Sequence, residues 1–169
     1  MVSPKTTPIV EINIDDVLSY RHDETILRFM DNFDITFEEG ESIFREMKLL
    51  LCLMAKFPDE YIFTHEPLWI IDEMWHTFLM YSKDYEDFCL KYFGKMIYHA
   101  PVKRAIKMDI IEKLKTDKEN TENMLRPTVK NLYTLIHDYL GRDTLIKWIK
   151  VLGEKYTIEY VNSIRKPIQ

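Results

Sequence analysis

Residues 67–81 read PLWIIDEMWHTFLMY, and the fold prediction for the chain starts from this segment. At about 100° per residue, apolar side chains cover roughly half of the circumference of a helix formed by this segment. These side chains are Leu68, Ile70, Ile71, Met74, Trp75, Phe78 and Leu79. The pattern predicts a helix from Pro67 to about Tyr81, with Pro67 in its first turn, where a missing N–H costs nothing.

The other half of this helix carries the most informative polar residues of the chain, Asp72, Glu73 and His76. Trp69 and Met80 stand on the same side, so the helix is apolar nearly all round, which indicates burial. Buried ionisable groups need partners. We therefore expect these three side chains to be hydrogen-bonded, paired or bound to a ligand.

Helix signals also lie on either side of this segment. Thr36-Phe-Glu-Glu39 is a capping-box pattern that opens a core helix to about Phe57, and Pro58 ends it. An earlier helix is predicted to begin near Asp23. After the central segment, Ser82 is expected to cap a helix over 83–93, closed by Gly94.

The rest of the chain reads as further helices. They are expected at about 102–116, at 124–140 with Pro127 near its start, at 144–156 with Asp143 as its cap, and in a short last one capped by Thr157. Residues 1–14 are predicted to form an extended N-terminal arm. The fold class is therefore predicted as all-α, with residues 15–169 forming a single-domain bundle of about six or seven helices.

Composition agrees with this fold class. The chain has 169 residues, which suits one domain, and 46% apolar with 30% charged residues is a globular balance. Only 4 glycines against 9 methionines favour helix over turn-rich β architecture. No apolar run is long enough to span a membrane, and the first residues have no signal-peptide pattern, so we expect a cytoplasmic protein without disulfides.

Charge is unevenly distributed. Residues 1–101 carry 9 Lys/Arg against 19 Asp/Glu, and residues 102–169 carry 14 against 9, so the net charges are −10 and +5. No block of five or six like charges occurs, which argues against nucleic-acid binding. The pattern is typical of solvated helix faces, or of a basic C-terminal face that meets an acidic partner.

Two spacings in the central helix are typical of metal sites. Asp72 and His76 are four residues apart and share a face. Glu73 and His76 form a Glu-x-x-His pattern, which di-iron bundles use twice. The chain contains it once, so a ferritin-like di-iron centre is poorly supported.

Cys89 and His99 extend this group, because helices joined by a tight turn lie side by side. Asp72, His76, Cys89 and His99 are predicted as ligands of a transition metal such as zinc or iron, with Glu73 as a candidate general base or additional ligand.

Two other hypotheses remain open. The same residues could form a buried polar network in a non-catalytic accessory module that binds a protein partner or a second copy of itself. Alternatively, Cys89 could be a nucleophile with His76 or His99 as its base and Asp72 orienting that base, although burial among aromatic residues would make the thiol inert. Whether the protein is an enzyme stays open at this point.

The segment from Ile70 to Pro101 resembles one in small bacterial proteins of uncertain function. They share an Asp-x-x-Trp-His helix, a Tyr-x-x-Phe-Cys helix, a Phe-Gly turn and a His-x-Pro. The matching positions here are Asp72, Trp75, His76, Tyr85, Phe88, Cys89, Phe93, Gly94, His99 and Pro101. The segment is similar, more distantly, to the helical region of glycine-rich-domain-containing proteins. The resemblance implies that His76, Cys89 and His99 belong to one constellation.

Overall fold

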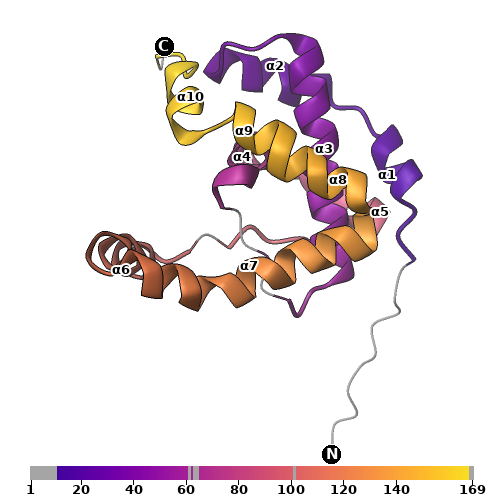
Figure 1. Cartoon of the computed structure of the whole chain (residues 1–169). Helices are drawn as coiled ribbons and strands as arrows, with labels where there is room; N and C mark the ends of the chain where they lie inside the picture. The colour runs from indigo at the N-terminus through magenta and orange to yellow at the C-terminus, as the bar shows by residue number, and fades with distance from the viewer. Residues whose placement is uncertain (1–10, 61, 63–64, 101, 168–169) are drawn as a thin grey trace, which may run out of the picture.

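The computed structural model describes residues 11–60, 62, 65–100 and 102–167. Within them the chain is helical, and the prediction of an all-α protein is confirmed (Figure 1). Residues 1–10 of the predicted arm lie outside the described residues, as does Pro101 of the His-x-Pro pattern. Residues 11–13 are neither helix nor strand, and the first helix begins at Ile14.

The N-terminal half is built around one long helix. Helices α1 (Ile14–Ser19) and α2 (Asp23–Asn32) precede α3 (Phe37–Lys56), and both pack against it. The predicted capping box is present: the Thr36 hydroxyl accepts from the backbone of Glu39, whose carboxylate accepts from the backbone of Thr36. These bonds satisfy donors that helix formation leaves free, and so fix where α3 begins.

The central segment begins with a 3-10 turn, η1 (Glu66–Leu68), that contains Pro67 and leads into α4 (Trp69–Leu79). Helix α5 (Ser82–Phe93) follows and ends at Gly94, whose φ of 66° is the left-handed conformation expected for a glycine cap. Ser82 is the first residue of α5, not its cap, and Tyr81 precedes it without a side-chain cap bond.

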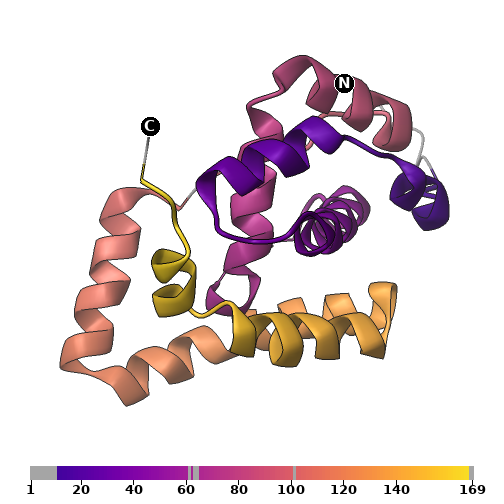
Figure 2. The same ribbon diagram turned by 90° about the horizontal axis from the view of Figure 1, so that it is seen from above.

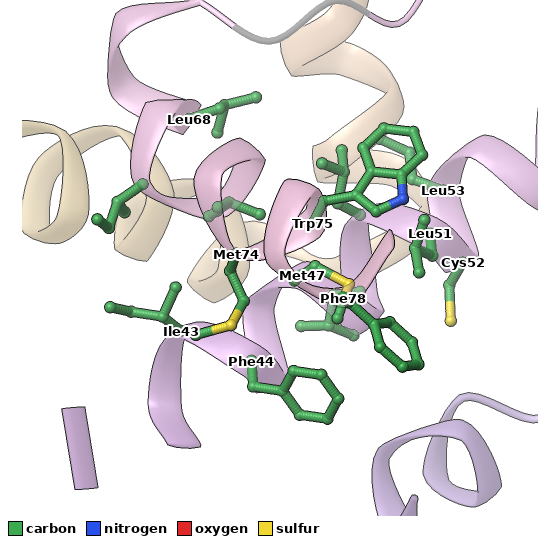
Figure 3. Packing of buried hydrophobic residues seen from close by; sticks show 14 of the residues in the cluster. Ile43, Phe44, Met47, Leu51, Cys52, Leu53, Leu68, Met74, Trp75 and Phe78 are labelled. Atoms are coloured by element: carbon green, nitrogen blue, oxygen red, sulfur yellow. The ribbon is translucent and has the colours of Figure 1, made fainter. Parts of the chain in front are cut away.

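The core lies mainly between α3 and α4. Figure 3 shows side chains of the two helices meeting there, with Phe44, Met47 and Leu51 from α3 and Met74 and Phe78 from α4. All five are at most 2% exposed. Burying side chains of this size contributes about 1.5–3 kcal/mol each, so α4 is held firmly and its polar residues have defined positions.

The C-terminal half contains α6 (Arg104–Thr116), α7 (Lys118–Leu140), α8 (Arg142–Ile146), a π-helical segment η2 (Lys147–Leu152), α9 (Gly153–Lys155) and α10 (Ile158–Ser163). Figure 2 shows α7 running back along α8 and η2. The expected start of α7 at 124 is wrong: Asp117 accepts from the backbone of Asn120 and caps the helix earlier, which leaves Pro127 in its interior.

Two further corrections concern the segment after α7. Asp143 does not cap α8, because the helix begins at Arg142 and Gly141 precedes it. The expected cap at Thr157 is confirmed, since its side chain accepts from the backbone of Tyr160.

A buried carboxylate ties the C-terminal half to α3. Glu46 is 0% exposed and accepts from the Trp148 indole at 2.8 Å, from Lys147 at 2.7 Å and from Arg45 at 2.9 Å. A buried charge is tolerated only with partners such as these. Among the described helices, none is both long and apolar enough to cross a membrane.

Candidate functional site

Three of the predicted ligands meet at the exposed side of α4. Asp72 and His76 lie one turn apart on α4, and His99 comes from the connector that follows α5. The His99 Nε2 atom lies 3.0 Å from Asp72 Oδ1, and His76 Nε2 lies 3.8 Å from Asp72 Oδ2. The two imidazole rings have centroids 4.5 Å apart. Each oxygen of one carboxylate therefore faces a different histidine.

A buried chain of hydrogen bonds brings His99 to this place. The Trp75 indole N–H donates to the Tyr85 hydroxyl at 3.1 Å, and that hydroxyl donates to the Ile97 carbonyl at 2.5 Å. Trp75 and Tyr85 are each 2% exposed. The Trp75 ring also meets His99 edge-on, with centroids 4.4 Å apart. The connector is thus attached to α4 and α5 two residues before the histidine.

The site is walled on one side and open on the other. The side chains of Asp72 and His99 are 17% and 14% exposed, whereas that of His76 is 47% exposed. One ligand atom from each residue can be chosen so that all three lie within 4.8 Å of one another. Ligand atoms around a tetrahedral zinc ion lie about 3.3 Å apart, given bonds of about 2.0–2.1 Å. A bound zinc ion would therefore draw the three ligand atoms closer together than the 4.8 Å limit within which they lie here.

Cys89 is not part of this group. The structure places it at 0% exposure in the core, where it is a free thiol. Burial raises the pKa of the Cys89 thiol, and hydrogen bonds with the Ile97 backbone and the Tyr85 hydroxyl oppose that rise less strongly. A buried thiol of raised pKa is a poor nucleophile. The geometry therefore favours a structural role, and ligation by Cys89 stays a prediction from the sequence.

Glu73 points to different partners. Its Oε1 atom accepts from the Trp69 indole at 3.1 Å and from Arg165 at 2.9 Å. Arg165 also lies over the Phe33 ring, 4.8 Å from its centroid. The carboxylate thus joins α4 to the C-terminal segment through one of its two oxygens, and a role of Glu73 as general base stays a prediction from the sequence.

Other His–carboxylate pairs occur, but each has only two members. His22 lies 3.4 Å from Asp84, and His137 lies 2.8 Å from Asp138. Within the part of the chain that the structure describes, Asp72, His76 and His99 form the one group of three or more such residues with metal-ligand spacing.

Sequence reasoning missed the residues that hold the site together. Tyr85 and Ile97 position His99, yet the sequence analysis named Tyr85 only as a position of the Tyr-x-x-Phe-Cys motif, without a role, and did not name Ile97 at all. Arg165 was also missed, because the 92 residues that separate it from Glu73 leave no local signal. For Tyr85 a local signal did exist: a tyrosine on an apolar helix face indicates a hydrogen-bond partner, since its hydroxyl needs one when buried.

The fold and the site define an all-α protein with a two-histidine, one-carboxylate cluster on a core helix. Residues 17–122 match the sequence model of an uncharacterised family described as UCP032817-like, and the chain belongs to this family. The matched region contains all three residues of the cluster. No curated protein and no solved structure matches the chain. The expectation of a family of small proteins of uncertain function is confirmed, whereas the shared motif and the likeness to glycine-rich-domain-containing proteins stay predictions.

Proposed function

We propose that this protein binds a divalent transition metal ion, such as zinc or iron, through Asp72, His76 and His99. The observation that carries the proposal is the convergence of two imidazoles and one carboxylate from separate segments within 4.8 Å. Imidazole nitrogen and carboxylate oxygen are ligands that zinc and non-haem iron both accept.

The surroundings of the cluster support this proposal. Metal sites hold their ligands in fixed orientations through neighbouring contacts. Here the Trp75 edge packs against His99, and the Trp75–Tyr85–Ile97 hydrogen bonds fix the connector that carries it. Asp72 stands on a helix whose opposite face is buried in the core.

Three protein ligands leave at least one coordination position for water or a substrate. That position would lie toward solvent, because His76 is the exposed member of the group. A bound metal would supply Lewis acidity there and would lower the pKa of a coordinated water. The protein's own contribution is to hold two histidines and an aspartate on one side of the ion.

The test uses protein purified without a histidine tag. We expect one equivalent of zinc or iron by elemental analysis, or one site of micromolar or tighter affinity in titrations of the metal-free protein. His99→Ala and His76→Ala should each weaken binding at least tenfold, as removing a ligand does. His137→Ala removes an exposed histidine beside a carboxylate and serves as the matched control. Binding that all three variants leave unchanged would refute the proposal.

The competing account treats the cluster as a polar network that only holds the connector against α4. It attributes the His99–Asp72 bond to packing and predicts no metal effect on stability. Metal binding predicts that the melting temperature rises with metal concentration. At a metal concentration one hundred times the dissociation constant, the free energy of unfolding should be about 2.7 kcal/mol higher than without metal. At the same metal concentration this rise should be clearly smaller in His76→Ala, whose exposed side chain contributes little to packing.

A further inference from the structure

Helix α6 is the least supported long helix of the molecule. Among the described elements, α7 is the one with which it makes more than marginal contact. Figure 2 shows α6 along one edge of the molecule, with α7 turning away from its end. No α6 residue whose burial the structure describes is buried. A helix of 13 residues is marginal in water without packing, so α6 needs a surface to pack on.

The beginning of α6 combines exposed apolar and basic side chains. Ile106 is 52% exposed, and Val102 just before the helix is 40% exposed. Lys103 and Arg104 are exposed beside them, and the first turn contains no acidic residue. An apolar patch with a basic rim fits an apolar patch with an acidic rim.

Helix α2 presents one exposed apolar side chain with acidic neighbours. Leu27 is 46% exposed on a helix whose other face is buried. Glu24 and Asp31 lie three residues before and four residues after it, so both share its face, and both are exposed, with Asp31 also 3.6 Å from Arg28 of the same helix. Figure 1 shows α2 and α6 at opposite ends of the molecule, so the two patches cannot meet within one chain.

We propose that α6 packs on α2 of a second copy of this chain, with Ile106 against Leu27 and the basic start of α6 beside Glu24 and Asp31. The proposal takes the closed form, in which a two-fold axis sets α6 of each copy on α2 of the other, because a contact between two different surfaces otherwise continues as an open chain of copies. A stable interface buries about 800 Å² per partner, and the reciprocal exchange supplies two helix faces toward that area. The −10 and +5 charges of the two parts of the chain favour the same pairing.

The first test measures the molar mass by sedimentation at protein concentrations from about 1 to about 200 μM, a roughly 200-fold range that covers micromolar dimer dissociation constants. The wild-type protein should be a dimer that weakens in high salt. Ile106→Glu should weaken it at least tenfold. Val151→Glu is the control, because Val151 is 57% exposed on the distant η2 segment and should leave the dimer unchanged. A wild-type monomer at every concentration, or equal effects of both variants, would overturn the proposal.

The second test exchanges charge between the two patches. Lys103→Glu/Arg104→Glu and Glu24→Lys/Asp31→Lys should each be monomeric alone, because each sets like charges against one another in both contacts. Mixed together they should form a heterodimer, since both contacts then pair opposite charges. All four positions are exposed, so circular dichroism should show that both variants fold. Two folded variants that fail to associate on mixing would rule out the α6–α2 contact.

Discussion

Replacing Tyr85 by phenylalanine tests how the site is held. The substitution keeps the ring and removes one hydroxyl that links the Trp75 indole to the Ile97 carbonyl. A buried donor or acceptor left without a partner costs about 1–3 kcal/mol. The substitution leaves two such groups without a partner, the Trp75 indole N–H and the Ile97 carbonyl. Part of this cost is offset, because phenylalanine has no hydroxyl that must be desolvated on folding. We expect the free energy of unfolding to fall by about 3 kcal/mol.

The assay is urea denaturation followed by tryptophan fluorescence, with thermal melting as a second measurement. A loss of about 3 kcal/mol lowers the melting temperature by roughly 6–12 °C in a chain of this size. Tyr98→Phe is the control: Tyr98 is 78% exposed on the same connector and should change stability by less than about 0.5 kcal/mol. If Tyr85→Phe cost no more than this control, the hydrogen-bonded bridge could not be what fixes His99.

Two further predictions concern buried titratable groups. Burial raises the pKa of Cys52 to about 12 and also raises that of Cys89. Neither thiol should therefore react with a disulfide reagent at pH 8 until the protein unfolds. Rapid labelling of the folded protein would contradict this prediction. Burial lowers the pKa of Lys48 to about 8, although its ammonium donates to the carbonyls of Leu18 and Tyr20. An unfolded lysine titrates near 10.4, so between about pH 8 and 10.4 the unfolded chain binds more protons and stability rises with pH. Relative to Lys48→Met, the wild-type protein should gain up to about 1.4 kcal/mol per pH unit in this window, and a flat difference would contradict the assignment.

Local signals in the sequence predicted much of the fold. The Thr36–Glu39 box, Gly94 and Thr157 act through backbone groups within a few residues, so their patterns reveal helix ends directly. The start of α7 was misplaced because Pro127 resembled a first-turn proline, whereas Asp117 caps the helix ten residues earlier. A proline inside a helix gives up one hydrogen bond, and the neighbouring turns of α7 keep the helix continuous.

The site was predictable only in part. Asp72 and His76 share a helix face by spacing alone, and the structure shows them together. His99 lies beside them because Tyr85 and Ile97 attach its connector to the core, a contact between segments that spacing does not encode. Cys89 was grouped with them because helices joined by a tight turn lie side by side, but its position on α5 turns the thiol into the core.

A crystal structure of zinc-soaked protein with anomalous data would show directly whether Asp72, His76 and His99 bind a metal ion. We expect one strong anomalous peak at about 2.0–2.2 Å from a nitrogen of each histidine and an oxygen of Asp72. A strong peak elsewhere with none at these residues, or a well-ordered cluster without any peak at saturating zinc, would contradict this expectation.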